Sequence, residues 1–382
     1  MVEKTEIKSS AALPFPGVIG QAAARMHLWR AIETDRLAHA FLFVGPDGVG
    51  RTALAFELAR ALNCQEHRFD TVESPCQCSS CRRIRKLEHP NLSLIFPLPR
   101  AETEKEKDEA QKVFDQHRAS KSEDPYAPIK YSGTGQIHIE LIRQLRNEFS
   151  LSADCVGIRV AVIQPADRLN PNSANALLKI LEEPPAKSCL ILIANTLRTL
   201  LPTIISRCQI IRLGPLSAEE IQQALVERLQ ADARKTATAA RLAAGSYARA
   251  CSLLDDSLAA QLTDSLEFLR RAAVSDLSAL ASKIDRWSRE GSRQETLERL
   301  DYLAVWIRDA MLIVTFAKEE APGYLVTTGH EDVIRKIGAR YSTGQLASVW
   351  EEIEEAKLDL ESNALTPLVL TALAVKIRRI MK

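Results

Sequence analysis

Residues 45–52 combine the residue types and the spacing of a loop that holds phosphate groups. The segment fits G-x-x-x-x-G-[K]-[ST], with Arg51 in the lysine position, and reads Gly45-Pro46-Asp47-Gly48-Val49-Gly50-Arg51-Thr52. Its glycines let backbone N–H groups curve around a phosphate, and Thr52 would hold Mg²⁺. Because a broad guanidinium does not replace an ammonium isosterically, we expect ATP and Mg²⁺ to bind weakly or not at all. A chance Gly-rich turn is the alternative.

The strand that would carry the acidic residues of an ATPase lacks them. In such enzymes one carboxylate orients Mg²⁺ and another polarises the attacking water. Here the apolar run 160–163 continues into Gln164-Pro165-Ala166-Asp167. Gln164 cannot neutralise a metal ion, Pro165 offers no base, and Asp167 lies too far along the chain for its side chain to point the same way. We therefore expect no ATP hydrolysis by this chain alone.

Four of the eight cysteines fall within eighteen residues, directly after the helix that the loop opens. They are Cys64, Cys76, Cys78 and Cys81. Four thiolates in a cytosolic protein suit a tetrahedral, structural Zn²⁺ site with no open position for catalysis. Four unrelated thiols are the alternative. The remaining cysteines, in apolar contexts, are expected to be small core residues: Cys155, Cys189, Cys208 and Cys251.

Arg207 lies at the end of a short predicted helix in the run 200–208 (LLPTIISRC). Pro202 lies near the first turn of that helix, where proline is tolerated. One interpretation is that Arg207 only complements the helix dipole. The other is that it serves a phosphate, and the neighbouring segments decide between the two.

The elements that must position these residues alternate between strands and helices. Apolar runs at 40–44, 159–163 and 189–194 are typical of buried parallel strands, and 52–62 has the spacing of a helix. This pattern predicts an α/β domain with a parallel sheet. Residues 101–124 are dense in charge and predict a solvated helix or a mobile insertion.

The chain changes character after Leu213-Gly214-Pro215. From Ser217 onward it is rich in Leu and Ala and helically periodic, and Ser217-Ala218-Glu219-Glu220 predicts a capping box. A small helical domain and then a larger helical bundle should follow. The last helix is expected over 365–381, with a basic end.

Composition limits the classes of function. The chain has 382 residues, 46% hydrophobic, with a net charge of +1 and only 5% aromatic residues. A stand-alone DNA-binding adaptor is disfavoured by the neutral charge and the few aromatic side chains. The sequence shows neither a transmembrane run nor an apolar signal core, so we expect a cytoplasmic protein with reduced thiols.

Four segments resemble a known family. The run 175–185 (NALLKILEEPP) is similar to a signature helix of bacterial clamp-loader subunits, as are 39–43 (HAFLF), 206–208 (SRC) and 245–250 (GSYARA). The chain thus resembles the AAA+ ATPases of the DNA polymerase III clamp loader over residues 15–100 and 136–255. The delta-prime type, related to gamma/tau, lacks acidic residues of its own and keeps the arginine, as here.

The resemblance implies a role for several residues. Arg207 would act as an arginine finger on ATP held by a neighbouring subunit. Asn195 or Thr196 would take the sensor-1 position and Arg249 would lie near the sensor-2 position. Val18 and Ile19 belong to a segment that touches adenine. Family members also carry a four-cysteine zinc module after the loop helix. They usually have two residues between each of the last three cysteines, whereas only Gln77 separates Cys76 from Cys78 here.

The resemblance also implies an architecture and partners. It predicts a RecA-like P-loop AAA+ domain over 1–214, with the zinc module at 64–81 and a charged insertion at about 97–135. A small helical lid over 215–256 and an all-α C-terminal collar over 257–382 would follow. The partners would be gamma/tau and delta subunits in a hetero-pentamer, the sliding clamp, and primer-template DNA through the complex. An ATP-hydrolysing gamma/tau-type subunit is the alternative.

Overall fold

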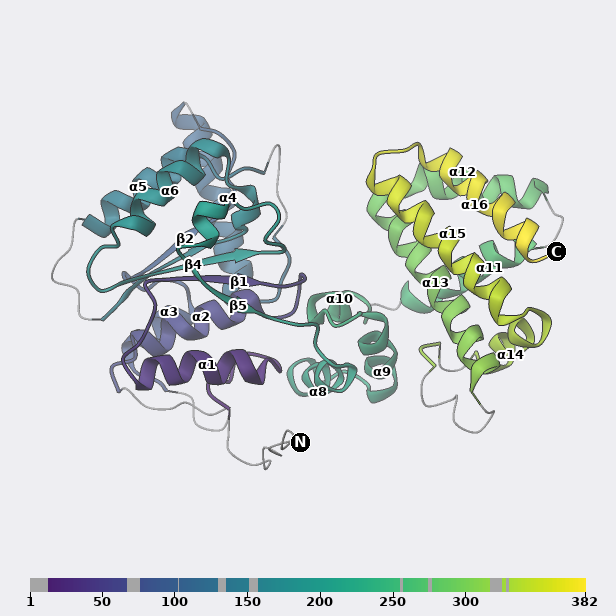
Figure 1. Cartoon of the computed structure of the whole chain (residues 1–382), viewed down its shortest axis with the longest axis horizontal. Coiled ribbons are helices and arrows are strands. Elements are labelled where there is room, and N and C mark those ends of the chain that lie inside the picture. The colour runs from purple at the N-terminus through teal and green to yellow at the C-terminus, as the bar shows by residue number, and fades with distance from the viewer. Residues whose placement is uncertain are drawn as a thin grey trace. The chain divides into compact units, whose positions relative to one another are not determined.

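The computed structural model describes residues 13–66, 76–101, 103–129, 135–150, 157–254, 257–273, 277–316, 325–327 and 330–382. The chain divides into two compact units. The first comprises residues 1–230 and 243–250, and the second comprises residues 231–242 and 251–382. Figure 1 shows the sheet and its helices in the first unit and a helical bundle in the second.

A five-stranded, fully parallel sheet forms the centre of the first unit, in the order β2-β3-β4-β1-β5. The strands are β1 (Ala40–Val44), β2 (Leu92–Ile95), β3 (Arg159–Ile163), β4 (Ser188–Ala194) and β5 (Gln209–Arg212). The three predicted strands are confirmed, and their near-continuous burial accounts for the apolar runs. Strand β1 pairs with β4 from Ala40 opposite Leu190 to Val44 opposite Ala194.

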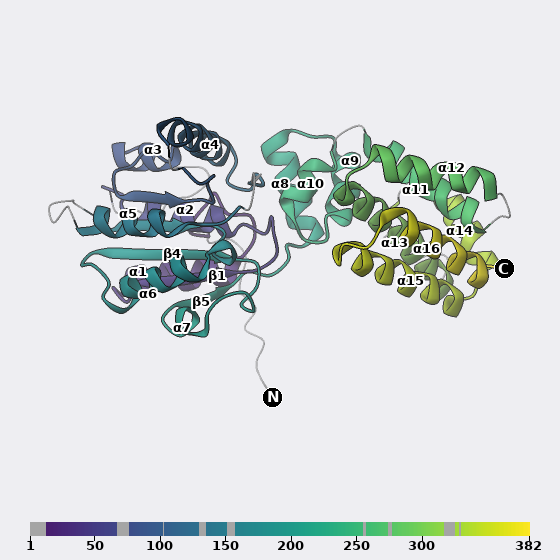
Figure 2. The same cartoon turned by 90° about the horizontal axis from the view of Figure 1, so that it is seen from above.

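Helices cover both faces of the sheet, with α5 and α6 on one side and α1, α2 and α3 on the other (Figure 1). The helices of this part of the chain are α1 (Ala22–Glu33), α2 (Arg51–Leu62), α3 (Ser79–Arg85), α4 (Glu104–Glu123), α5 (Ile139–Ser150), the 3-10 turn η1 (Ala166–Arg168), α6 (Pro171–Glu182), α7 (Pro202–Ile205), α8 (Ala218–Leu229) and α10 (Tyr247–Ser252). Figure 2 gives the view from above, and α4 meets α3 near their C-terminal ends, where the Ser122 hydroxyl donates to the Arg85 carbonyl at 3.0 Å.

The core under α5 and α6 follows from the strand period. Alternate residues of a strand point to the same face, and Leu42, Ile163 and Leu192 are fully or almost fully buried on this one. Leu145 of α5 and Leu177 of α6 pack against them. This core holds the carboxyl ends of β1, β3 and β4 in fixed positions next to one another.

The charged stretch 101–124 is a helix over most of its length, namely α4. Its start is fixed by a capping box, in which the Thr103 side chain accepts from the Glu106 N–H and the Glu106 side chain accepts from the Thr103 N–H. Most of α4 is exposed, but Ala110 and Lys121 are buried. Of the two alternatives that the sequence left open, the helix is confirmed.

The second unit is built from helices alone in the part of it that the structure describes. Its helices are α9 (Ala233–Leu242), α11 (Ser257–Ala273), α12 (Leu277–Glu290), α13 (Arg293–Thr315), α14 (Glu331–Arg340), α15 (Thr343–Glu361) and α16 (Thr366–Ile380). Helix α13 packs against α11, α14 and α15, and α16 packs against α11, α12 and α15. Trp287 and Trp306 are fully buried in this bundle, and the Trp287 ring stacks on Phe268 with centroids 4.8 Å apart.

The predicted capping box at residues 217–220 is also confirmed. The Ser217 side chain accepts from the Glu220 N–H, and α8 begins at the next residue. Among the described residues, none of the helices has both the length and the apolar character that crossing a bilayer requires.

Candidate functional site

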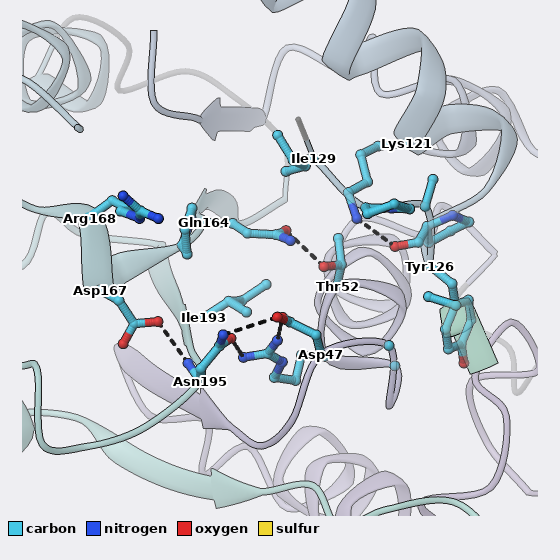
Figure 3. A pocket seen from close by; sticks show the side chains of 18 of the residues that line it. Asp47, Thr52, Lys121, Tyr126, Ile129, Gln164, Asp167, Arg168, Ile193 and Asn195 are labelled. Carbon is cyan, nitrogen blue, oxygen red and sulfur yellow. Dashed lines mark hydrogen bonds and ion pairs between the residues drawn. The ribbon is translucent and has the colours of Figure 1, made fainter. Parts of the chain in front are cut away.

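A cavity of about 460 Å³ lies at the carboxyl ends of β1, β3 and β4. Its walls come from the loop before α2 and the start of α2, the ends of β3 and β4 with the residues that follow them, Lys121 of α4 with residues 125–129, and Ala248 of α10. Figure 3 shows these side chains around the opening. Cavities at the carboxyl ends of parallel strands are the usual ligand sites of open α/β sheets.

The loop between β1 and α2 has the backbone of a phosphate-binding loop. Gly48 and Gly50 have φ of 76° and 103°, in the left-handed region that favours glycine. A Cβ on Gly48 would lie 2.1 Å from Ser246 Oγ and 2.9 Å from Ala248 Cβ, so any other residue would be strained and would force these neighbours to shift. Helix α2 then begins at Arg51, and its N-terminal residues Arg51 and Thr52 line the cavity, at the helix end that favours anions.

Arg51 is turned toward protein groups inside this cavity. It is 7% exposed and forms an ion pair with Asp47. Its Nη1 also donates to Asn195 Oδ1 at 2.5 Å, and Asn195 Nδ2 donates to Asp47 Oδ2 at 3.1 Å. These three side chains form a closed triangle of hydrogen bonds (Figure 3), so the guanidinium is already neutralised by a carboxylate.

Thr52 has an amide as its partner. Its hydroxyl donates to Gln164 Oε1 at 2.8 Å, across the cavity from β3 (Figure 3). The residue at the end of β3 is therefore next to the hydroxyl expected to hold Mg²⁺, as the sequence indicated. An amide oxygen carries no charge with which to neutralise a divalent ion.

Asp167 lies nearer to the cavity than its sequence position suggested. The expectation that its side chain points elsewhere is wrong in one respect, because Asp167 lines the cavity. However, its carboxylate accepts the Asn195 N–H at 2.8 Å and the Thr199 hydroxyl at 2.6 Å. The 3-10 turn after Pro165 brings it to the loop after β4, where it serves as a structural acceptor.

Two cavity residues that sequence reasoning missed come from the charged insertion predicted at about 97–135. Lys121 and Tyr126 are 3% and 4% exposed, and both line the cavity. Burial lowers the pKa of Lys121 to about 8; nearby Asp124 and Asp47 favour the charged form and Arg51 disfavours it. The sequence feature that could have indicated their burial is Tyr126 itself, an aromatic residue between Pro125 and Pro128 in a segment with few large apolar side chains.

The other sequence-predicted nucleotide residues divide into two groups. Gly48, Gly50, Arg51, Thr52, Asn195 and Thr196 line the cavity. Gly45, Val18, Ile19 and Arg249 do not belong to the described lining. Val18 and Ile19 are buried, and the Ile19 N–H donates to the Tyr126 hydroxyl at 2.8 Å.

Arg207 follows α7 and does not line the chain's own cavity within the described residues. Its guanidinium is about one-third exposed, bonded to the Thr203 carbonyl at 3.1 Å and paired with Glu182 at 3.0 Å. Glu182 ends α6, within the run 175–185. The arginine is thus held at the surface by a carboxylate, a carbonyl and the Ser206 hydroxyl at 3.4 Å, and its side chain stays partly exposed.

The four predicted cysteines form one cluster. The sulfur atoms of Cys64, Cys76, Cys78 and Cys81 all lie within 4.8 Å of one another, and three of the four residues are buried. Zn–S bonds of about 2.3 Å in a tetrahedron place sulfurs about 3.8 Å apart, so this donor set fits a zinc ion after a small contraction. The cluster can therefore bind a metal ion with four protein ligands.

The thiols of this cluster differ in acidity. Burial opposes ionisation of Cys78, but the hydrogen bonds that its sulfur receives, led by the Cys81 N–H, outweigh it and lower its pKa to about 7. Burial raises the pKa of Cys76 and Cys81. Among the other cysteines, Cys189 is buried while Cys208 and Cys251 are half-buried, and Cys155 lies outside the described residues.

Comparison with known proteins points to one family. A family model described as DNA polymerase III, delta subunit, matches residues 20–217, slightly more than half of the chain. The delta' subunit of DNA polymerase III from Bacillus subtilis is 32% identical over 53% of this chain and 50% of its own length. The tau subunit from the same organism is 27% identical over 85% of this chain and 52% of its own.

A gamma-subunit-related protein of DNA polymerase III from Thermotoga maritima covers 93% of this chain and 99% of its own, with 13% identity and a TM-score of 0.40. The chain spans about half the length of the curated sequence relatives it matches.

Proposed function

Because the chain belongs to the DNA polymerase III delta-subunit family, we propose that it is a delta-prime-type, largely non-hydrolytic subunit of a clamp loader. In this role it supports the loading of a sliding clamp during DNA replication and supplies Arg207 to ATP bound by a neighbouring subunit. Its partners are gamma/tau and delta subunits in a hetero-pentamer, the sliding clamp, and primer-template DNA through the complex. The site of action is the cytoplasm.

One observation carries the non-hydrolytic part of this proposal, namely the contact between Thr52 and Gln164. The threonine hydroxyl and the amide oxygen of Gln164, the residue after β3, meet at 2.8 Å, which is where a magnesium ion would need a carboxylate. Asp47 and Asp167, the nearby carboxylates, are engaged by Arg51 and by groups of the loop after β4. Without a metal ligand or a base in place, phosphoryl transfer loses its main electrostatic support.

Arg207 supports the part of the proposal in which this chain acts on ATP bound by a neighbouring subunit. Its guanidinium is partly exposed and lies at the end of a helix, outside the lining of its own cavity. An arginine supplied in trans stabilises the charge on a transferred phosphoryl group, at a rate gain of about 10³–10⁵. By the same resemblance, Asn195 or Thr196 takes the sensor-1 position, and the hydrogen bonds of Asn195 to Asp47 and Arg51 support a site that has become structural.

Residues 257–382, which make up most of the second unit, fit the role of a collar. Three apolar residues form an exposed stripe along α16. They are its N-cap Leu365, Leu368 and Val375, with exposed fractions of 69%, 66% and 61%. Their spacing of three and seven residues places them on one helix face. We assign residues 257–382 to assembly, 215–256 to a lid, and 1–214 to a RecA-like AAA+ domain.

A basic hollow supports a contact with DNA. It has a volume of about 290 Å³ and lies between α5 and α6, lined by Arg143, Arg146 and Lys179 together with two asparagines. Such side chains position the phosphate backbone without reading its sequence. With a net charge of +1, this contact belongs to the assembled complex rather than to a stand-alone DNA-binding protein.

The cysteine cluster is proposed to hold a structural zinc ion. Cys64, Cys76, Cys78 and Cys81 supply all four ligands, so no position stays open for a substrate. The ion would join the end of α2 to α3 and stabilise a small module with little apolar core of its own.

An ATP-hydrolysing gamma/tau-type subunit is the alternative, favoured by the longer stretch shared with a tau subunit. Turnover by the isolated chain separates the two. The delta-prime proposal predicts no magnesium-dependent ATP hydrolysis by the purified chain, and activity only after gamma/tau and delta subunits are added. Rapid turnover by the chain alone would contradict the proposal and support the alternative.

The arginine is tested by Arg207→Ala in the reconstituted complex. We expect hydrolysis at the neighbouring site to fall by about 10³–10⁵, while the complex still assembles. Arg198→Ala is the matched control, because Arg198 is an exposed arginine that precedes α7. ATPase activity that is unchanged in Arg207→Ala would remove the finger role.

A further inference from the structure

Tyr126 makes a contact that neither the resemblance nor the comparisons assign. It follows the charged helix α4, yet its hydroxyl accepts the backbone N–H of Ile19, 107 residues earlier in the sequence, at 2.8 Å. The side chain is 4% exposed. An insertion expected to be solvated thus places an aromatic ring inside the first unit.

The surroundings of the ring come from three separate parts of this unit. Its edge meets the Tyr247 ring of α10, with centroids 4.9 Å apart, and the Arg228 guanidinium lies 5.5 Å from its centroid. Its hydroxyl lies 2.9 Å from the point that a Cβ on Gly50 would occupy. The ring is therefore enclosed by α8, α10 and the phosphate loop.

A nucleotide base bound beside this phosphate loop would need the same surroundings. A purine is a flat ring that requires aromatic or apolar walls and a few polar groups that fix its orientation. Ile19 belongs to the segment to which the resemblance gives adenine contact. Its one N–H is already donated to Tyr126, and the flat space beside Tyr247 holds the tyrosine ring.

Segment 121–127 is held by its own hydrogen bonds. Lys121 Nζ donates to the Pro125 carbonyl at 2.9 Å, and the Tyr126 N–H donates to Asp124 Oδ1 at 2.9 Å. The Ser122 hydroxyl donates to the Arg85 carbonyl at 3.0 Å, which ties the segment to the end of α3. Tyr126 is thus pre-positioned, and a ligand would have to displace an ordered side chain.

We propose that Tyr126 determines the ligand specificity of this cavity by occupying the place of a nucleotide base. The chain is closed to ATP at two points, the base position by Tyr126 and the phosphate position by the Arg51–Asp47 pair. The inference rests on the proposed nucleotide site, and it explains how a loop with phosphate-binding geometry can stay free of nucleotide. ATP enters only when segment 121–129 withdraws.

The test measures ATP binding to the full chain by equilibrium dialysis with radiolabelled ATP and Mg²⁺. Four proteins form a cycle: the wild type, Tyr126→Ala, Arg51→Lys, and the double variant. We expect removal of the ring to tighten ATP binding at least tenfold in the Arg51→Lys background. Arg51→Lys alone should bind no more than threefold better than the wild type, because its base position is still filled.

Two further variants control for trivial effects. Tyr126→Phe keeps the ring and should bind ATP as weakly as the wild type. Tyr341→Ala removes a tyrosine from the second unit and should change nothing. Thermal unfolding followed by circular dichroism identifies any variant that has lost its fold, and Tyr126→Leu then serves as the smaller perturbation.

The proposal is overturned if ring removal changes ATP affinity by less than threefold in both backgrounds, or if Tyr126→Phe binds as tightly as Tyr126→Ala. These outcomes are independent of the arginine finger. Tyr126 is tested by binding to the isolated chain, whereas Arg207 is tested by ATP hydrolysis in the assembled complex. A failure of one therefore leaves the other to be decided by its own measurement.

Discussion

Lys121 brings a positive charge into a part of the cavity with little access to water. Its ammonium donates to the Pro125 carbonyl at 2.9 Å and lies among Arg51, Asp47 and Asp124. Burial disfavours the charged form and lowers its pKa from 10.5 to about 8. The folded chain therefore releases this proton at a lower pH than the unfolded chain does.

The pH dependence of stability should reveal this lysine. Below about pH 8 both states are protonated and the folded state bears the full desolvation cost. Between about pH 8 and 10.5 only the unfolded state holds the proton, so stability rises with pH. The free energy of unfolding of the wild type should gain about 3 kcal/mol over this range relative to Lys121→Met.

Urea unfolding of both proteins at several pH values measures this difference. Lys112→Met is the control, because Lys112 is an exposed lysine on the same helix and should leave the pH profile unchanged. Parallel profiles for the wild type and Lys121→Met would show that the ammonium is solvated in the folded chain.

At this scale the sequence located the phosphate loop, Gln164 and the four cysteines, since their positions follow from local spacing. It did not locate the side chains with which these residues form hydrogen bonds and ion pairs. Asp47 pairs with Arg51 four residues along the same loop, but its bond from Asn195 depends on a strand far away in the sequence. Tyr126 and Lys121 were hidden because the composition of their segment indicates solvent, whereas burial of a few members is set by tertiary packing.

Among the elements, the buried parallel strands were predictable and the edge of the sheet was not. β1, β3 and β4 are buried nearly throughout, so their apolar runs are unambiguous. β2 is only four residues long and half-exposed at its start, and its residues Leu92-Ser93-Leu94-Ile95 are too few to distinguish from a loop. Helix α4 was left open because its polar surface suits a solvated helix and a disordered chain equally.

The module between α2 and α3 should depend on its metal. The cluster lies at the end of α2, with Cys78 capping α3 through its side chain, so loss of the ion would loosen both helix ends. We expect about one equivalent of zinc in the purified chain, and a lower melting temperature after strong chelation. Cys81→Ser should lose the metal and show the same lower melting temperature.

Metal analysis measures the zinc content of the chain and its variants, and thermal unfolding measures the change in melting temperature. Cys208→Ser is the control, because that half-buried thiol lies outside the cluster and its loss should leave the zinc content at one equivalent. A metal-free chain that melts at the same temperature as the metal-loaded one would reject the zinc site.

At the scale of the whole molecule, the second unit shows how much of a helical bundle can be predicted from a helical sequence pattern. The periodicity predicted a bundle and its last helix, which is α16. It could not show which apolar side chains stay uncovered, because a stripe that packs inside the chain and one that packs on a partner have the same spacing. Only the structure separates buried Leu370 and Leu373 from exposed Leu368 and Val375.

That exposed stripe leads to a prediction about assembly. A double substitution, Leu368→Glu with Val375→Glu, places two carboxylates on a face that is water-exposed in the isolated chain, so its free energy of unfolding should change by less than about 0.5 kcal/mol per site. If residues 257–382 form the collar, the same carboxylates become buried and unpaired in the complex, which costs several kcal/mol. Affinity for the gamma/tau and delta subunits should therefore fall at least tenfold.

Size-exclusion chromatography and surface binding assays with the partner subunits measure that loss. Leu229→Glu is the matched control, since Leu229 is an exposed apolar residue at the end of α8, in the first unit. It should retain the wild-type affinity. Because the double variant keeps its own stability, a weakened complex can only reflect a face shared with another subunit, and an undiminished complex would place the assembly surface outside this stripe of α16.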